Sequence, residues 1–339
     1  MTPLVSIIIN NYNYGRFLKE AIESALQQTY DNIEIIIVDD GSVNNSRDII
    51  NKYSDQCIAI FKENGGQASA FNIGITASTG EYILLLDSDD YLFERAIEVC
   101  LATIRPGLSR VYFKPDVVDT DGNQVDVAND RMYFDEFEGD VFDRIKLGGS
   151  FPFSPTSMNF FNAEYLKATL PIPVQEFRIC ADTYILVRSA LAGPVCSVNQ
   201  VLGAYRIHSN NNFARRDLKL ADRAGLKAYI DNYYRIRHLI SQACRERNFD
   251  YSYGPDYADY IILQGLIIGY RLGIESQHFK AHSRKSLLEF SVNYLRHGTP
   301  RKSRRIMHFS YALLLIYLPS SISEKLAERV DQWRSRRDR

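Results

Sequence analysis

Residues 82–90 run Tyr82-Ile83-Leu84-Leu85-Leu86-Asp87-Ser88-Asp89-Asp90, an apolar stretch that changes abruptly into a cluster of carboxylates. A short apolar run flanked by turn-forming residues is typical of a buried strand. Carboxylates at the end of such a strand repel one another, and a divalent cation would compensate their charge. Ligands of open α/β sheets bind at the carboxyl ends of the strands, so this cluster is a candidate site for a metal and an anion. The alternative is a helix N-cap with a solvated turn.

Strands and helices alternate through the first hundred residues. Apolar runs predict strands at residues 5–9, 33–38, 58–61 and 82–86. Helical periodicity predicts helices at residues 15–28 and 46–53, and a third that follows Gly65-Gly66 and ends at Ala77. This alternation indicates βαβ units in a mostly parallel sheet, and the nearly continuous apolar strands indicate that helices cover both faces.

The pattern changes twice in the rest of the chain. Residues 111–118 and 125–127 are compatible with a hairpin around Asp121-Gly122, 180–191 with a helix, and 195–206 with one or two strands. Beyond residue 212 the periodicity is helical, over 217–247, 255–273, 277–297, 303–317 and 321–336. We therefore expect an α/β domain at 1–212, with a nucleotide-binding part at 1–105 and an acceptor side at 106–212, and a helical region at 213–339.

The composition is that of an ordinary globular protein, and its charge is unevenly distributed. The 339 residues are 45% hydrophobic and 24% charged, and their net charge of −1 gives no sign of a nucleic-acid partner. Residues 301–339 contain ten basic and four acidic side chains, which leaves this tail at +6 and the rest of the chain at −7. A basic, apolar tail suits a helix in an anionic membrane interface. The alternative is a helical hairpin that packs on the protein itself or on a second copy in a homodimer.

Cysteine usage and apolar run lengths bear on the compartment. The five cysteines form no CxxC pair, and their odd number and wide spacing favour reduced thiols. Residues 5–9 are too short for the apolar core of a signal peptide. No apolar run approaches the roughly 20 residues of a membrane-spanning helix. We therefore expect a cytoplasmic protein, and the basic tail is compatible with a peripheral position at the inner face of the plasma membrane.

Two further strand ends carry polar side chains that suit a nucleotide. The first strand runs into Asn10-Asn11-Tyr12-Asn13-Tyr14, and the second ends in Asp39-Asp40-Gly41-Ser42. An aromatic face can stack on a base, and a carboxylate can accept from a ring N–H group. Tyr12 could instead be a packed aromatic, and Asp39 an Asx-turn residue. The chain lacks GxGxxG after the first strand and GxxxxGK[ST] throughout, which argues against dehydrogenases and P-loop enzymes.

Several ordered motifs together resemble the inverting, family-2 type of nucleotide-sugar glycosyltransferase with the Rossmann-like GT-A fold. They cover about residues 4–105 closely and extend more loosely to 208. The matching segments are VSIII running into NYN (residues 5–13), SALQQT (24–29), VDDGS (38–42), NGGQASAFNIG (64–74) and GEYILLLDSDDY (80–91). The last contains the acidic DxD site of that family.

The resemblance implies a role for each of these polar residues. It implies that Asp39 accepts from the uracil N–H, that Tyr12 stacks on the base and that Asn10 lies beside it. Asp89 and Asp90 would face the ribose and the Mn²⁺ or Mg²⁺ that bridges the diphosphate, with Asp87 close by. The remaining residues implied for the nucleotide pocket are Asn64, Gln67 and Asn72, whose alternative duties are turns and helix caps.

The resemblance also implies a general base on the acceptor side. Asp182, followed by Arg188, fits the usual spacing and would deprotonate the acceptor hydroxyl. Ala181 stands where the family often has Glu, which puts the usual second carboxylate in doubt. Asp182 could alternatively be a helix-start residue favoured by the helix dipole. Arg206 and His208 match a late motif and would contact the diphosphate and the metal, respectively, although a lone His is often structural.

We therefore expect a metal-dependent enzyme that moves a sugar from a nucleotide diphosphate, with UDP as the expected nucleotide, to a hydroxyl of a glycan or lipid-linked acceptor. The expected setting is surface polysaccharide biosynthesis, and the expected sugar is a hexose or an N-acetylhexosamine. Two alternatives remain at this stage. One is a non-catalytic module on the same fold that binds sugar nucleotides or glycans. The other is a nucleotidyltransferase, although the glycine-rich basic loop that such enzymes use near the N-terminus is absent.

Overall fold

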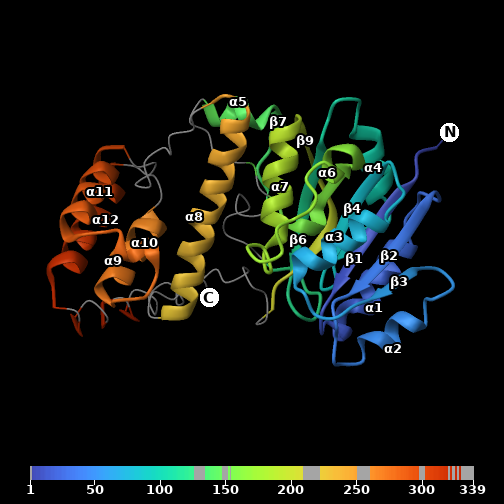
Figure 1. Ribbon diagram of the computed structural model, residues 1–339, viewed down its shortest axis with the longest axis horizontal. Coiled ribbons are helices and arrows are strands. Elements are labelled where there is room, and N and C mark those ends of the chain that lie inside the picture. The colour runs from blue at the N-terminus through green and yellow to red at the C-terminus, as the bar shows by residue number, and fades with distance from the viewer. Residues whose placement is uncertain are drawn as a thin grey trace. The chain divides into compact units, whose positions relative to one another are not determined.

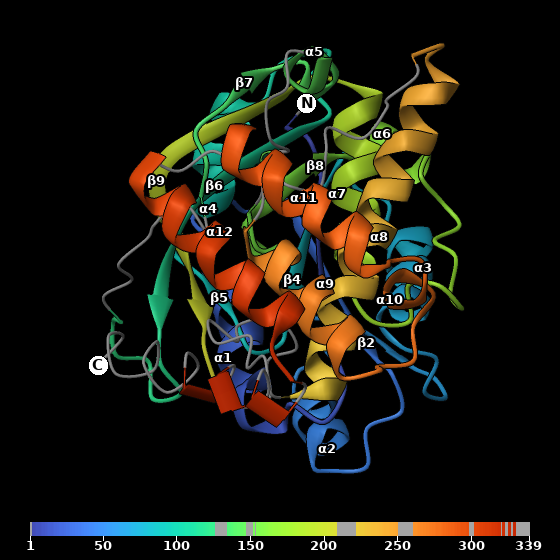
Figure 2. The same cartoon turned by 90° about the vertical axis from the view of Figure 1, so that its left-hand side faces the viewer.

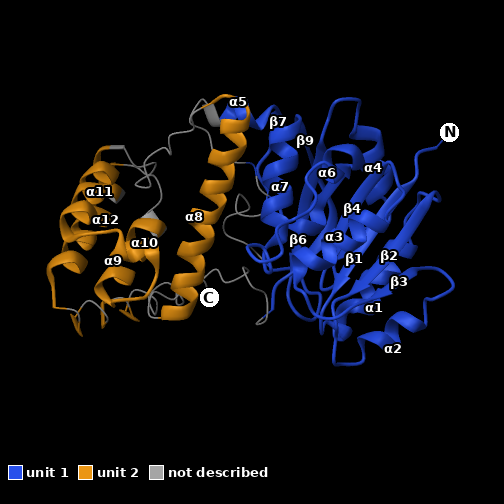
Figure 3. Cartoon of the chain, viewed as in Figure 1, with its two compact units in different colours: residues 1–210 blue, residues 211–339 orange. Residues whose placement is uncertain are grey.

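The computed structural model describes residues 2–125, 134–146, 152, 154–208, 222–249, 260–297, 302–319, 321–322, 325–326 and 328–329. The chain divides into two compact units, residues 1–210 and 211–339 (Figure 3). The division lies two residues from the boundary expected from the change of periodicity. Each unit is described by itself below.

A nine-stranded mixed sheet organises the described part of the first unit (Figure 1). The strand order is β3-β2-β1-β4-β8-β6-β9-β5, and β7 pairs with β9. The strands are β1 (Val5–Asn11), β2 (Ile33–Asp39), β3 (Ile58–Phe61), β4 (Tyr82–Asp87), β5 (Tyr91–Leu92), β6 (Arg110–Val118), β7 (Glu138–Gly139), β8 (Asn159–Asn162) and β9 (Val195–Arg206). The α/β GT-A fold class is therefore confirmed, although the sheet is less uniformly parallel than expected.

The departure from a parallel sheet has a topological origin. Strands β1 to β4 are mutually parallel, as the alternation of elements predicts. Strand β8 then lies antiparallel between β4 and β6, and β6 pairs in parallel with β9. These later pairings join strands that are distant in sequence, so local periodicity carried no information about them.

Alternating side chains of the central strands bury themselves on opposite faces of the sheet. Ile7 and Ile9 pack with α1 (Gly15–Leu26) and α4 (Ala96–Thr103) in one apolar core. Ile8 faces the other side, where it meets Gly74 of α3 (Gln67–Ala77). The other helices of this unit are α2 (Ser46–Asn51), α5 (Val141–Lys146), α6 (Ala163–Lys167) and α7 (Ala181–Ala192). Coverage of both faces explains why these strands are nearly continuously apolar.

The parallel register brings three strand ends to one edge of the sheet. Asn10 pairs with Val38 of β2 on one side and with Asp87 of β4 on the other. Asn11 pairs with Asp39. The polar residues that end β1, β2 and β4 are therefore neighbours in space, because the strands run in the same direction and in step.

The second unit is helical in the part that the structure describes. It contains α8 (Arg223–Glu246), α9 (Tyr260–Arg271), α10 (Gln277–Lys280), α11 (Arg284–His297) and α12 (Lys302–Tyr317), and α11 and α12 lie side by side (Figure 2). The helix expected over 277–297 is interrupted, because the Ser283 hydroxyl accepts from the Ser286 N–H and caps a new helix. No helix in the described ranges is long and apolar enough to cross a membrane.

The close approach of α3 to the sheet makes Gly74 a sensitive position. A Cβ atom at residue 74 would lie 2.6 Å from Ile8 Cγ2 and 3.2 Å from Val38 Cγ2. We expect Gly74→Ala to lower the free energy of unfolding by about 1–3 kcal/mol, because a packed helix–sheet contact must open to admit the methyl group. Urea unfolding measures this loss.

Thr76→Ala is the matched control, since Thr76 is exposed on the same helix. It should leave the free energy of unfolding within about 0.5 kcal/mol of the parent. Equal stability of the parent and Gly74→Ala would mean that α3 does not pack this closely.

Candidate active site

The base-binding side of the edge is built from the ends of β1 and β2. The Asn11 Nδ2 atom donates to Asp39 Oδ1 at 2.7 Å. The Ser42 hydroxyl donates to the same oxygen at 2.6 Å, and the Ser42 N–H donates to Asp39 Oδ2 at 3.0 Å. A carboxylate has about four acceptor positions, so these bonds leave room for one more donor on Oδ2. Asp39 is thus both the Asx-turn residue of the alternative interpretation and an acceptor that can still take a ring N–H.

Tyr12 follows β1 and keeps 46% of its surface exposed. The next residue, Asn13, has a left-handed backbone with φ of 63°. Its side-chain oxygen accepts from the Val43 N–H at 2.8 Å, and its own N–H donates to the Ser42 hydroxyl at 2.8 Å. These bonds fasten the turn that carries Tyr12 to the turn that carries Asp39. The exposed ring is therefore held near the Asp39 carboxylate by a constrained backbone.

Asp40 shapes the loop that follows β3, a role that the sequence did not reveal. Its buried carboxylate accepts from the Gly65 N–H at 2.9 Å and from the Gly66 N–H at 2.7 Å. It also forms an ion pair with Lys62 and accepts from the Asn64 amide at 3.1 Å. These contacts join residues that are more than twenty positions apart in the sequence, and no local motif predicts them.

The same loop is joined to the segment that leads into α7. The Arg178 guanidinium donates to Asn64 Oδ1, and the Gln67 N–H donates to the Arg178 carbonyl at 2.8 Å. Gly66 has φ of 86°, and a Cβ there would lie 2.4 Å from the Arg178 carbonyl oxygen. The Ala181 N–H in turn donates to Gln67 Oε1 at 2.9 Å. The 64–67 loop therefore sets the position of the start of α7.

Asn72 is not brought into this cluster by its contacts. Its Nδ2 donates to the Ile172 carbonyl at 2.9 Å, and its Oδ1 accepts from the Ile172 N–H at 2.8 Å. Both ends of the amide thus hold a neighbouring loop. The nucleotide-binding role expected for Asn72 has no support from this geometry.

The acidic residues after β4 separate into different environments. Asp87 Oδ1 accepts from Asn10 Nδ2 at 3.1 Å. The Asp90 carboxylate, 2% exposed, accepts from the Ser157 hydroxyl at 2.6 Å and from the Arg206 N–H at 2.9 Å. Asp89 Oδ2 instead meets His208 Nε2 at 2.9 Å. Asp90 is therefore directed into the protein, and the metal-ligand role expected for it stays a prediction.

Burial and mutual repulsion disturb the ionisation of this cluster. Burial, with the negative charges of Asp89 and Asp182, raises the pKa of Asp87 well above its usual value. Burial and the charges of Asp89 and Asp87 raise the pKa of Asp90 in the same way. Burial and the charges of Asp89, Asp87 and Asp90 also raise the pKa of Tyr14 to about 12. The site holds an excess of negative charge for which a bound cation would be a natural partner.

Two aromatic rings and a carboxylate hold His208. The imidazole stacks on Phe17 with a centroid distance of 5.2 Å and lies 5.5 Å from the Tyr14 ring. The side chain is 6% exposed, and that of Asp89 is 14% exposed. The late motif thus brings His208 directly to the acidic cluster, although 119 residues separate it from Asp89.

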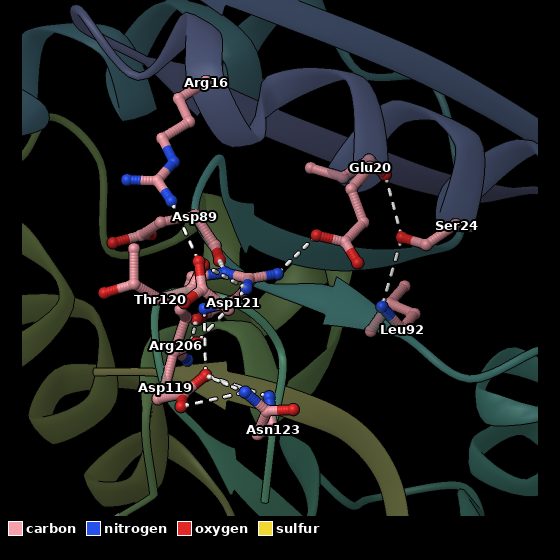
Figure 4. A network of polar contacts seen from close by, with 12 residues as sticks. Arg16, Glu20, Ser24, Asp89, Leu92, Asp119, Thr120, Asp121, Asn123 and Arg206 are labelled. Carbon is pink, nitrogen blue, oxygen red and sulfur yellow. Dashed lines mark hydrogen bonds and ion pairs between the residues drawn. The ribbon is translucent and has the colours of Figure 1, made fainter. Parts of the chain in front are cut away.

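Arg206 has partners other than the diphosphate expected for it (Figure 4). Its Nε donates to the Asp89 carbonyl at 2.9 Å, and one terminal nitrogen donates to the carbonyls of Asp119 and Thr120 at 3.3 and 3.2 Å. The other terminal nitrogen forms an ion pair with Glu20 of α1. The Arg206 side chain is 3% exposed, and its contacts fix the backbone of the acidic loop. This geometry gives no support to the diphosphate-binding role expected for Arg206.

Asp182 lies in the first turn of α7, directly after Cys180 and Ala181. Burial raises the pKa of Asp182, and hydrogen bonding from the Thr183 N–H and the Thr156 hydroxyl opposes the rise. The negative charge of Asp182 contributes to the raised pKa of Asp87, so the two carboxylates belong to one cluster. Ala181 is completely buried, so the Glu that the family often has would not fit here without rearrangement. Cys180 has φ of 68°, a strained conformation for a side chain of this kind.

The described residues contain no ready-made cage for a metal, since no group of three or more His, Cys, Asp or Glu converges among them. Asp89 and His208 supply two donors whose oxygen and nitrogen lie 2.9 Å apart. Adjacent ligands of an octahedral Mg²⁺ ion with bonds of about 2.1 Å lie about 3 Å apart. The pair therefore fits two neighbouring positions of a metal whose other ligands come from elsewhere.

Comparison with known proteins agrees with this geometry. Residues 6–169 match the family model described as glycosyl transferase family 2. An uncharacterized glycosyltransferase from Nostoc sp. is 37% identical over 217 residues, which are 61% of this chain and 66% of that protein. The chain thus spans slightly less than two thirds of this curated relative. These matches confirm the expected resemblance: residues 6–169 form a family-2 glycosyltransferase domain.

Solved structures share the fold. S. aureus TarS 1-349 in complex with UDP-GlcNAc superposes with a TM-score of 0.56 at 16% identity, over 98% of this chain and 92% of that one. The mannosyltransferase PcManGT from Pyrobaculum calidifontis, in complex with GDP-Man and Mn²⁺, gives a TM-score of 0.51 at 13% identity, over 98% and 88%. At such low identity these likenesses concern the fold alone.

The raised pKa of Asp87 has a consequence for stability. The folded protein holds a proton on this group at pH values where the unfolded chain, with a pKa near 3.8, has lost it. Stability is therefore lost as the pH rises through the folded-state pKa. We expect Asp87→Asn to raise the thermal midpoint of the ligand-free protein by a few degrees at about pH 7.5, because an amide folds without either a buried charge or the uptake of a proton.

The difference between the parent and Asp87→Asn should shrink as the pH falls toward about 4, where the parent carboxyl is itself protonated. Differential scanning calorimetry across this range measures it. Asp48→Asn, an exposed carboxylate in the first turn of α2, is the control and should show no such pH-dependent gain. A variant less stable than the parent at every pH would contradict the proposed charge excess.

Proposed function

We propose that the chain is an inverting glycosyltransferase that moves a sugar from a nucleotide diphosphate, UDP in the first instance, to a hydroxyl of a glycan or lipid-linked acceptor. The observation that carries this proposal is that the charge of Asp182 acts on Asp87 at the end of β4, while Asp89, two residues further on, meets His208. A base candidate and a candidate cation site then lie close together, and the strand end that carries Asp87 and Asp89 belongs to the segment that matches family 2. The proposed setting is surface polysaccharide assembly.

The nucleoside would lie across the ends of β1 and β2. Tyr12 offers an exposed ring for stacking, and Asp39 Oδ2 retains an acceptor position for the N–H of uracil. Asn10 and Asn64 border the same edge through their bonds to Asp87 and Asp40. The UDP-GlcNAc complex of TarS supports a UDP sugar, and the GDP-Man complex of PcManGT keeps the identity of the base open.

A divalent cation, Mn²⁺ or Mg²⁺, would be held by Asp89 and His208, with Asp87 nearby. The observed donor separation fits this assignment, and the excess of carboxylates supports it electrostatically. When bound, such an ion neutralises the charge that grows on the diphosphate leaving group. Asp90 and Arg206 would act indirectly, by fixing the backbone that carries Asp89.

Asp182 would accept the proton of the attacking acceptor hydroxyl. Burial has already raised its pKa, which moves it toward the pH at which a base works and away from that of an exposed aspartate. Attack on the face of the sugar opposite the diphosphate inverts the anomeric centre, through a transition state with oxocarbenium character. Gln67 would fix the position of Asp182 relative to the 64–67 loop, because its side-chain oxygen accepts a hydrogen bond from the Ala181 N–H at the start of α7.

Replacement of the base separates binding from chemistry. We expect Asp182→Asn to bind the donor as the parent does and to lower the turnover of sugar transfer by about 10²–10⁴-fold, because the amide cannot take the proton. A thermal-shift screen of nucleotide sugars with Mn²⁺ first identifies the donor, since a ligand of the native state raises the midpoint. Release of nucleotide diphosphate in the presence of acceptor then measures turnover.

Asp48→Asn makes the same chemical change in the first turn of another helix and should keep full turnover. Near-normal turnover by Asp182→Asn would assign the base to another residue. If no nucleotide sugar shifts the midpoint or is consumed, glycosyl transfer itself would be refuted as the function.

The metal assignment has its own test. We expect Asp89→Asn and His208→Ala each to weaken Mn²⁺-dependent donor binding by at least about tenfold, because each removes one ligand. Isothermal titration with donor, with and without a chelator, measures the metal-dependent part. Asp121→Asn, an exposed carboxylate paired with Arg16, should behave as the parent does. Donor binding and transfer that persist unchanged under chelation would exclude the metal from the mechanism.

A further inference from the structure

Helix α12 is apolar on two opposite sides. Ala312, Leu315 and Ile316 are completely buried in the core of the second unit, where they pack with side chains of α9 and α11. The other side exposes a set that we call the α12 stripe: Ile306 (48% exposed), Met307 (59%), Leu314 (49%) and Tyr317 (59%). An amphipathic helix at the surface of a core normally shows polar residues there.

The members of the α12 stripe lie on one side of the helix. Ile306 and Met307 are adjacent and therefore lie about 100° apart around the helix, and Leu314 and Tyr317, at spacings of three, seven, eight, ten and eleven, fall within the same arc. Five of the eleven large exposed hydrophobic side chains in the described part of the chain lie between residues 306 and 322. Single exposed apolar residues are ordinary, but a concentration of them indicates an interaction surface.

Positive charge accompanies the stripe. Lys302, at the start of α12, is exposed, as are Lys325 and Arg329 beyond its end. Residues 301–339 together carry +6, while the remainder of the chain carries −7. The apolar and the basic features therefore belong to the same short segment of the chain.

The charge discriminates between the possible occupants of this surface. In a two-fold dimer built on the α12 stripe, each copy would present the same patch to the other, so the exposed Lys302, Lys325 and Arg329 of one copy would approach the same cations of the other. An anionic bilayer instead offers an apolar layer for the stripe and negative headgroups for the lysines and arginines. This combination is how helices lie in a membrane interface without crossing the bilayer.

We propose that the α12 stripe, with the exposed basic residues Lys302, Lys325 and Arg329, docks the protein onto an anionic lipid bilayer, with α12 in the plane of the headgroups. The stripe faces away from the core that anchors α12, so immersion would leave the packing of the second unit intact. The inference does not depend on the proposed glycosyl transfer, since neither the stripe nor the basic residues belong to the candidate active site.

Vesicle flotation of the full chain tests the proposal. We expect the protein to float with vesicles made of equal parts phosphatidylcholine and phosphatidylglycerol and to remain behind with vesicles of phosphatidylcholine alone. Rising salt should release it, because screening weakens the attraction to the headgroups.

Two sets of variants separate the apolar from the basic contribution. We expect Ile306→Ser combined with Leu314→Ser to weaken vesicle binding by at least about tenfold. Ile58→Ser is the matched control, because Ile58 is 50% exposed on the edge strand β3. Lys325→Glu combined with Arg329→Glu should also weaken binding about tenfold, whereas Lys19→Glu combined with Lys52→Glu, at exposed lysines of the first unit, should not. An unchanged thermal midpoint shows that each variant folds.

Three outcomes would overturn the proposal. The first is failure of the parent to float with either kind of vesicle. The second is equal flotation of the α12 variants and their controls. The third is a dimer in sedimentation velocity that the Ile306 and Leu314 changes convert to a monomer, without any vesicle binding by the parent; the stripe would then be a contact between copies.

Discussion

Mutual repulsion among carboxylates at one edge of the sheet is the constraint on which the rest of the site depends. Asp87, Asp89, Asp90 and Asp182 come from two distant parts of the chain, and burial together with their mutual repulsion raises the pKa of Asp87 and Asp90. Each carboxylate has a different environment. Asp87 contacts an amide, Asp89 an imidazole, and Asp90 a hydroxyl and a backbone N–H, whereas Asp182 lies in the first turn of a helix. The fold therefore maintains a concentration of charge that would disperse in an unconstrained chain.

The sequence was most informative where the physical signal is local. Apolar runs that end in polar residues located β1, β2 and β4, and their parallel alignment then placed Asn10, Asp39 and Asp87 at a common edge. The fold class and the family followed from the order and spacing of these motifs. The mixed order of the later strands did not follow, because pairing between distant strands leaves no periodic trace in either of them.

The division of labour within the site was the less predictable part. The resemblance to the family assigned Asp89 and Asp90 the same task and gave Arg206 an anion to bind, but their hydrogen bonds differ from one another. The role of Asp40 rests on contacts with Lys62, Gly65 and Gly66, across more than twenty residues. A carboxylate that holds a loop and one that faces a ligand look identical in a sequence, since the difference lies in which donors surround them.

Arg206 connects the candidate site to parts of the protein that would not touch a substrate. One guanidinium joins helix α1, the turn at residues 119–120 and the backbone of Asp89, three segments that are remote from one another along the chain (Figure 4). A change at Glu20, which is half exposed and far from any proposed chemistry, would thus be transmitted to the acidic loop. A substitution on the outer side of α1 would therefore reach the backbone of Asp89 without touching any side chain proposed to bind the donor or a cation.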